Sequence, residues 1–375
     1  YAVFGGLKAV AVSDSINAVG LLIGGILVPI FGLMMIGDGS ILDGLSRLTT
    51  ENPDKFKSMG GPADPVPFYT IFTGMMLVQL FYWGTNQQII QRALGAKDLK
   101  EGQKGLLLAS FIKILGPLIV VLPGIIAYHL FQGNLESADG AYPMLVKKVL
   151  PSAWVGFFAA VLFGAILSSF NSVLNSSVTL FGIDVYKEHI NKNADEKMIV
   201  KYGKTFGVIL ALASMFIAPL IANAGSLFDY LQEINGIYSI PIFSIIIVGY
   251  LTKRVPAIAA KIGLVSGCLL YIISQFFMKD YFINKALETA KASGITDKAA
   301  LTILEVQAYP HFLDVMAILF ILNVVIMLII GKIKPREVPF VQQYTKQVDI
   351  TPWKYVKHAG IVICAIVIGV YVYFA

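Results

Sequence analysis

Long apolar stretches alternate with short polar segments along the whole chain. A helix needs about 20 predominantly apolar residues, each rising about 1.5 Å, to cross the hydrocarbon layer of a membrane. Nine stretches come close to or exceed that length: 9–37, 67–90, 105–130, 152–184, 205–223, 227–250, 257–278, 312–331 and 356–375. Backbone in lipid must satisfy its own hydrogen bonds, and barrel strands would alternate polar with apolar residues. The pattern therefore predicts membrane-spanning α-helices.

Some stretches carry helix-breaking residues. Pro117 and Pro123 predict a break in the third stretch, and Gly236 and Pro241 predict an interruption of the sixth. Broken helices at membrane depth are where carriers keep their binding sites. Residues 281–308 have the pattern of one or two short amphipathic helices, which we expect at the outer surface of the membrane.

Composition and charge support a membrane protein. Hydrophobic residues make up 57% of the chain and charged residues 14%, whereas soluble domains carry about a quarter charged residues. The loops predicted inside hold roughly twice as many Lys and Arg residues as the loops predicted outside, which is the positive-inside signal. The net charge of +6 therefore sets orientation in a lipid bilayer and does not indicate a nucleic-acid partner. A multi-pass plasma-membrane protein, of a bacterial inner membrane, is expected.

The ends of the chain and its rarer residues add two expectations. The chain opens without methionine in what has the pattern of a helix tail, and it stops at Ala375 inside its last apolar stretch. We therefore expect a fragment that lacks helices at both ends. Cys268 and Cys364 lie in apolar stretches and are expected to be packing residues. The four histidines form no metal-binding motif.

Lys113 stands out among the polar residues of the apolar stretches. A charge in mid-membrane costs at least about 2.5–3.5 kcal/mol, so it requires a partner or a function. Lys113 lies about eight residues from the inner end of its helix, which predicts a polar cavity beside it. A lysine that snorkels to the interface or takes part in a structural ion pair is the alternative.

The helix predicted over 152–184 carries small and polar residues on nearly one face. They are Gly164, Ser168, Asn171, Ser172, Asn175 and Ser176. Such a face can be a groove for close packing of helices. It can also be a cation site, because hydroxyl and carbonyl oxygens are the ligands that Na⁺ prefers. The adjacent hydroxyls of Ser168 and Ser169 favour the cation site.

The run QLFYWGTNQQIIQR gathers amides and aromatic rings in one stretch, among them Gln79, Tyr82 and Trp83. Amides supply the paired donors and acceptors that sugar hydroxyls need, and a ring can stack on a pyranose face. An aromatic belt at the membrane interface is the alternative. A second polar run, FDYLQEINGIYSIP, contains Gln232. The stretches hold no paired catalytic aspartates, HExxH or Ser–His motif, so we expect a carrier and not an enzyme.

At these residues the sequence resembles the solute:sodium symporter family, and within it the bacterial sodium/galactose and animal sodium/glucose carriers. The matching segments occur in order over about 1–250: YAVFGGLKA, the Ser-Asp pair at Asp14, FYWGTNQQIIQR, the Gln-Lys-Gly and Phe-Ile-Lys of 103–113, ILSSFNSVLNSSVTLFGIDVYKE and FDYLQE. The resemblance implies an all-α LeuT-like fold of two inverted repeats. Residues 1–250 would hold the end of the fourth to the tenth core helices, and 251–375 peripheral helices.

The resemblance also implies roles for single residues. Na⁺, the coupling ion, would be bound by Ser168 and Ser169 with the carbonyl of Ala165, and Asp14 would face that region. In relatives that bind a second Na⁺, the ligands beyond the serine pair fall at Asn171 and Ser172.

The implied substrate residues are Lys113 and Gln232, with Tyr82 as an inner gate that stacks on the sugar and Trp83 beside it. Gln79 stands where the galactose carrier has asparagine. The expected function is Na⁺-coupled sugar import by alternating access. Symport of inositol, sialic acid, an amino acid or a vitamin remains an alternative, as do a transporter-like sensor and a channel; the sequence leaves the oligomeric state open.

Overall fold

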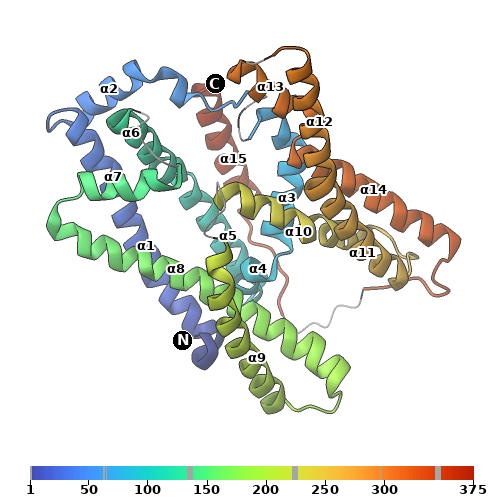
Figure 1. Cartoon of the computed structure of the whole chain (residues 1–375). Helices are drawn as coiled ribbons and strands as arrows, with labels where there is room; N and C mark the ends of the chain where they lie inside the picture. Colours follow the sequence, from blue (N-terminus) through green and yellow to red (C-terminus); the bar gives the residue numbers. More distant parts are fainter. Residues whose placement is uncertain are drawn as a thin grey trace. The chain divides into compact units, whose positions relative to one another are not determined.

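The computed structural model describes residues 2–61, 64, 66–132, 138–221, 227–295, 297–342 and 348–375. Across these ranges every regular element is a helix (Figure 1). The chain divides into two compact units. The first comprises 1–58, 87–227 and 348–375, and the second comprises 59–86 and 228–347.

Eight helical segments of the described residues are long and apolar enough to cross a membrane. They are 8–36, 99–131, 152–190, 196–221, 230–251, 257–292, 303–333 and 356–373. Each coincides with one predicted stretch, so eight of the nine are confirmed as long apolar helices.

The prediction of one continuous span over 67–90 was wrong. This segment forms a short 3₁₀ helix η2 (Phe68–Phe72) followed by α3 (Gly74–Gly84) and α4 (Gln87–Leu94). The break after α3 has a local cause, because Thr85 and Asn86 both donate their backbone amides to the Phe81 carbonyl and end the helix there. Hydropathy alone did not reveal this break.

The first unit is built from long helices and short connectors. They are α1 (Ala2–Ile36), α2 (Ile41–Glu51), η1 (Pro53–Phe56), α4, α5 (Leu99–Lys113), η3 (Pro117–Val121), α6 (Leu122–Phe131), η4 (Ala138–Gly140), α7 (Ala141–Val149), α8 (Ser152–Leu180), η5 (Phe181–Ile190), α9 (Glu196–Ile217), η6 (Ala218–Ile221) and α15 (Val356–Tyr373). Of the connectors, η3 and η5 have π-helical geometry.

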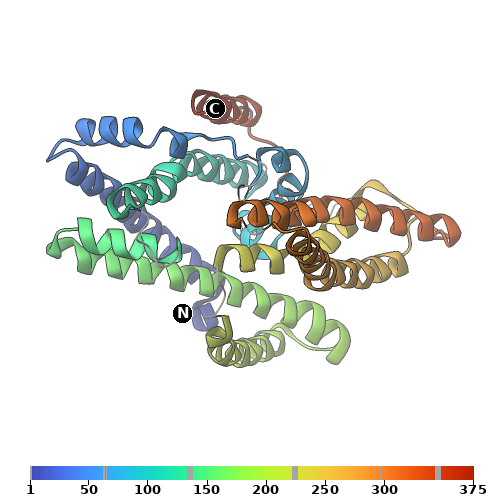
Figure 2. The ribbon, with the colours of Figure 1, turned by 45° about the horizontal axis from the view of Figure 1, so that its top comes forward.

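The seam between α1 and α8 organises the first unit, and the two helices lie side by side in both views (Figures 1 and 2). Small residues on α1 permit this close approach. A Cβ atom at Gly20 would lie 3.0 Å from Val161, and one at Gly24 would lie 3.3 Å from Phe158. The α1–α8 seam therefore fixes which residues of the two helices face each other.

The predicted interruption of the third apolar stretch is confirmed. Helix α5 ends at Lys113, the π segment η3 begins at Pro117, and Pro123 lies in the first turn of α6. A proline ring removes a backbone donor and clashes with the preceding turn, so the regular helical bonding cannot continue through Pro117.

The second unit contains α3 and the C-terminal half of the chain. Its further helices are α10 (Leu227–Leu251), α11 (Ala257–Ile273), η7 (Ser274–Met278), α12 (Lys279–Ala292), α13 (Lys298–Ala308) and α14 (Phe312–Ile333). Helices α11 and α14 pack side by side (Figure 2). One or two short helices were expected over 281–308, and the structure has two there, α12 and α13.

The predicted interruption of α10 was wrong, because the helix continues through both Gly236 and Pro241. Gly236 serves close packing: a Cβ atom there would clash with the ring and hydroxyl of Tyr271 and would lie 2.5 Å from the Met316 methyl. Beyond Pro241, the Ser244 hydroxyl donates to the Pro241 carbonyl at 2.8 Å. The helix is therefore continuous at both positions where its sequence predicts a break.

This packing leads to a stability prediction. Gly236→Ala should lower the free energy of unfolding by about 1–3 kcal/mol, because the added methyl overpacks a core that has no room for it. Gly249→Ala on the same helix is the matched control, since nothing lies within 4 Å of a Cβ atom there. Thermal unfolding of the detergent-purified proteins measures the difference, and equal melting temperatures for the two variants would contradict this account of Gly236.

Candidate functional site

Asp14 of α1 is the acidic centre of a polar cluster in the first unit. Its side chain is only 15% exposed, and its Oδ1 accepts a 2.5 Å hydrogen bond from the Ser168 hydroxyl of α8. The close α1–α8 seam makes this contact possible, because it brings a carboxylate and a hydroxyl from two apolar helices within reach of each other. The structure thus brings together two of the residues predicted for ion binding.

Arg92 of α4 supplies the cation of the cluster. Its Nη2 forms an ion pair with Asp14 Oδ2 and donates to the Ser172 hydroxyl at 2.5 Å. Ser172 in turn donates to the Ser168 carbonyl at 2.7 Å. A single guanidinium nitrogen therefore joins α4 to both α1 and α8.

Gln91, beside Arg92, anchors α4 a second time. Its side chain is buried, with Nε2 donating to the Ser172 carbonyl at 3.3 Å and Oε1 accepting from Asn175 Nδ2 at 3.0 Å. Asn171 is also buried, but its amide donates to the Leu167 carbonyl of its own helix at 2.8 Å. The observed cluster of side-chain oxygens near Asp14 therefore comprises Ser168 and Ser172.

Other residues of α8 show that both interpretations of its polar face have support. Asn17 of α1 donates to the Gly164 carbonyl at 3.2 Å, and a Cβ atom at Gly164 would lie 2.7 Å from the Asn17 side chain, so this part of the face is a packing seam. Ala165 is half-buried and Ser169 is exposed in this chain. Ser169 thus lies beside the Asp14 cluster without belonging to it.

Three of the predicted substrate residues lie together on α3, in the second unit. The indole nitrogen of Trp83 donates to Gln79 Oε1 at 3.0 Å, across one helical turn. The rings of Tyr82 and Trp83 meet edge to face, with their centroids 5.4 Å apart. An amide and two rings, half-buried to exposed, thus form one polar aromatic surface.

The remaining predicted substrate residues, Gln232 and Lys113, belong to other helices. Gln232 is half-buried on α10 in the second unit, next to Glu233, whose carboxylate binds Lys279 Nζ at 2.6 Å. Lys113 belongs to the first unit, where it is the exposed last residue of α5 before the helix breaks. The predicted residues are therefore divided between the two units, with the ion-binding set and Lys113 in one.

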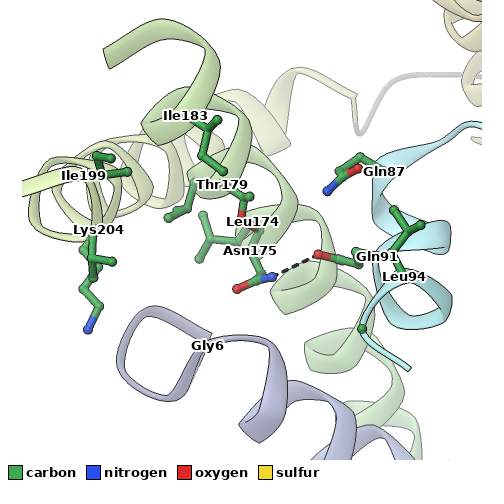
Figure 3. Close-up of a pocket in the computed structure, with 13 residues that line it drawn as sticks. Gly6, Gln87, Gln91, Leu94, Leu174, Asn175, Thr179, Ile183, Ile199 and Lys204 are labelled. Atoms are coloured by element: carbon green, nitrogen blue, oxygen red, sulfur yellow. Dashed lines mark hydrogen bonds between the residues drawn. The ribbon is translucent and has the colours of Figure 1, made fainter. Parts of the chain in front are cut away.

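A cavity of about 490 Å³ lies among α1, α4, α8, η5 and α9 in the first unit (Figure 3). The hydrogen-bonded pair of Gln91 and Asn175 lies at one side of it, and Gln87 and Lys204 add polar groups from α4 and α9. Most other lining side chains are aliphatic. The cavity therefore adjoins the Asp14 cluster through Gln91.

Sequence reasoning missed Arg92 and Gln91 as parts of the site. Both lie in the run QQIIQR. The rings and amides just before this run were interpreted as a sugar site, and Gln91 and Arg92 were not assigned a role. The available signal was the helical spacing of Gln88, Gln91 and Arg92, which predicts a polar face on α4.

Comparison with known proteins gives consistent matches. The model of the sodium:solute symporter family matches residues 1–267. The chain is 47% identical over 372 residues to "Uncharacterized symporter YidK" of Escherichia coli (strain K12), covering 99% of this chain and 60% of that protein. It is 34% identical over 299 residues to the sodium/glucose cotransporter of Vibrio parahaemolyticus (74% and 55%), and 31% identical over 307 residues to human sodium/myo-inositol cotransporter 2 (73% and 45%).

The fold of this chain is also similar to that of a solved structure. A Na⁺-coupled sialic acid symporter in a substrate-bound, outward-open state matches with a TM-score of 0.63 and 18% identity, over 90% of this chain and 65% of that one. The predicted fold class, an all-α polytopic membrane protein of the LeuT-like type, is confirmed. The chain spans about half the length of the curated relatives it matches. The match to the Escherichia coli protein covers 99% of this chain and so includes most of the residues beyond 250, outside the segments that carry the resemblance.

The Asp14 cluster can be tested by its contribution to stability. Asp14→Asn should lower the free energy of unfolding by about 2 kcal/mol, because it removes the charge that the half-buried Arg92 requires. Asp38→Asn is the matched control, since Asp38 is 79% exposed and its ion pair with Arg47, at 3.0 Å, is worth less than about 1 kcal/mol. Melting temperatures of the two purified variants measure the difference. If Asp14→Asn lowers the melting temperature no more than Asp38→Asn does, the ion pair with Arg92 does not stabilise the fold.

Proposed function

We propose that this chain, which belongs to the sodium:solute symporter family, forms part of a carrier that imports a sugar together with Na⁺ by alternating access. Membership of this family, together with eight long apolar helices among the described residues, identifies a multi-pass protein of the plasma membrane. The observation that carries the proposal is the hydrogen bond from Ser168 to Asp14, which holds a carboxylate and hydroxyls together within apolar helices. Carboxylate and hydroxyl oxygens suit a hard monovalent cation.

The proposed Na⁺ site is formed by the hydroxyls of Ser168 and Ser169 with the carbonyl of Ala165. Two properties of the structure support it: Ser168 already faces the Asp14 carboxylate at 2.5 Å, and Ser169 is adjacent to it on α8. Na⁺ would lose its water here and gain protein oxygens in exchange.

The proposed sugar site uses the polar aromatic surface of α3. Gln79 offers an amide whose oxygen is already placed by Trp83 at 3.0 Å, and Tyr82 presents a ring that can stack on a sugar and close the inner side. Lys113 and Gln232 would add hydrogen bonds to hydroxyls. Two of the named relatives, a glucose and a myo-inositol cotransporter, bear names of polyhydroxyl solutes, which supports this substrate class.

Coupling follows if Na⁺ and sugar together favour one conformation more than either does alone. The outside Na⁺ gradient and the membrane potential would drive uptake, since a unit charge gains about 2.3 kcal/mol per 100 mV. A carrier of this kind makes and breaks no covalent bonds, and we assign no enzymatic activity. In this proposal residues 1–250 belong to the transport core and 251–375 to peripheral helices.

Uptake into proteoliposomes tests the function directly. The full-length protein should accumulate labelled galactose or glucose when Na⁺ is outside and not when choline replaces it, because the ion gradient supplies the driving force. The same assay is run with labelled myo-inositol, sialic acid and proline. Na⁺-dependent uptake of one of these, and not of a sugar, would identify another solute class. Uptake of every solute at the same rate in Na⁺ and in choline would defeat the proposal.

Ser169→Ala tests the ion site by itself. Loss of one oxygen ligand should raise the Na⁺ concentration that gives half-maximal uptake by about tenfold or more, with expression unchanged. Ser177→Ala on the same helix is the control, because its hydroxyl only donates to the Val173 carbonyl at 2.9 Å. An identical Na⁺ dependence in both variants would rule out Ser169 as a ligand.

A further inference from the structure

Basic residues gather at one end of the second unit. They belong to the turn between α10 and α11 and to the segment that follows α14, and both connections are among the loops predicted inside. All of them are exposed, and together we call them the basic cluster: Lys253, Arg254, Lys332, Lys334 and Arg336. Across the described residues 250–256 and 332–342, Glu337 is the one acidic residue. The cluster therefore carries a strong net positive charge.

Two backbone hydrogen bonds join the two connections. The Arg336 amide donates to the Arg254 carbonyl, and the Phe340 amide donates to the Lys253 carbonyl, each at 2.8 Å. These bonds hold the segment after α14 against the turn between α10 and α11. Basic residues that are far apart in the sequence therefore share one surface.

Close apolar packing lies next to these hydrogen bonds. A Cβ atom at Gly331 would lie 2.7 Å from a Val255 methyl, so the glycine permits α14 to approach the turn. Val255 also packs against a small buried core that comprises Val248, Ala259 and Met327. Neither the packing nor the backbone bonds depend on the charges of the basic cluster, so the fold holds these charges together although they repel one another.

The charges of the basic cluster are not neutralised within the described part of the chain. None of its five side chains forms an ion pair with a described Asp or Glu residue. Helix α11 begins at Ala257, just beyond the turn, and no side chain caps its N-terminus, so the positive end of the helix dipole adds to the same field. An anion bound here would relieve the mutual repulsion of the basic side chains.

Apolar and aromatic side chains next to the basic cluster indicate its depth in the membrane. Tyr250 and Leu251 at the end of α10, and Ile333 at the end of α14, are exposed. The Arg336 guanidinium lies over the Phe340 ring, 5.6 Å from its centroid. Rings and cations that follow the last apolar turns of membrane-spanning helices lie at the level of the lipid headgroups.

We propose that the basic cluster binds the phosphate headgroup of an anionic phospholipid in the inner leaflet. The phosphate would accept hydrogen bonds from the two guanidinium groups, Arg254 and Arg336, with the lysines as further positive charges. The acyl chains would cover the exposed apolar ends of α10 and α14. The orientation of a membrane protein requires only that its inner loops carry enough charge, whereas a headgroup site requires the charges in one place. The two backbone bonds meet that second requirement.

Native mass spectrometry of the full-length, detergent-purified protein tests the proposal. With phosphatidylglycerol and phosphatidylcholine offered together, the wild type should bind phosphatidylglycerol at least about tenfold more tightly. Arg254→Gln/Arg336→Gln should weaken binding of phosphatidylglycerol by about tenfold or more, because two charges that face the headgroup are lost. Arg254→Lys/Arg336→Lys keeps both charges and should keep most of the preference.

A matched control separates a headgroup site from the general effect of positive charge. Lys197→Gln/Lys201→Gln removes two exposed cations from α9, near another connection predicted inside, and should leave the affinity for phosphatidylglycerol unchanged. An equal loss of affinity in this control would overturn the proposal, because only the total charge would then matter.

Two further outcomes would also overturn it. Equal affinity of the wild type for both lipids would do so even if Arg254→Gln/Arg336→Gln failed to fold. Complete displacement of phosphatidylglycerol by inorganic phosphate, at constant ionic strength, would show that the basic cluster binds a small anion and not a lipid. The proposal uses neither Na⁺ nor solute, so the uptake experiments above test the proposed transport function separately.

Discussion

A charged group inside a hydrocarbon layer keeps its charge only where partners replace the water that it has lost. Asp14, on α1, meets this requirement through Ser168 of α8 and Arg92 of α4. The close seam of α1 and α8 and the short helix α4 are therefore linked by the needs of one carboxylate. A shift of any of these three helices would therefore change the contacts of Asp14.

Much of the fold could be predicted because lipid imposes a simple rule on sequence. Eight apolar stretches are long helices. In one of them Pro117, which has no backbone N–H to donate, interrupts the regular α-helical bonding. The proximity of Asp14 and Ser168 also followed from the resemblance to known carriers. A proline or a long run of apolar residues determines the local structure by itself, whatever the distant parts of the chain do.

The failures have two causes: local backbone bonding in one case and contacts between helices in the others. Hydropathy runs unbroken through Thr85, yet the helix ends there because two successive amides turn back to Phe81. Pro241 predicts a break in α10, yet the helix continues, and just beyond it the Ser244 hydroxyl donates to the Pro241 carbonyl and accepts from Asn323 of α14. Arg92 lies in a short polar segment, and only the positions of α1 and α8 show which partners it has. The predicted substrate residues are divided between the two units, and the pattern of the sequence does not reveal that division.

The contact of Gly236 with Tyr271 and Met316 has a mechanical consequence. The Tyr271 ring of α11 and the Met316 methyl of α14 both lie against the bare backbone of α10 at this one point. If α10 rotated about its axis or slid along it here, both side chains would have to move with it or change rotamer. A displacement of α10 that changes the environment of Gln232 would therefore be felt by two neighbouring helices.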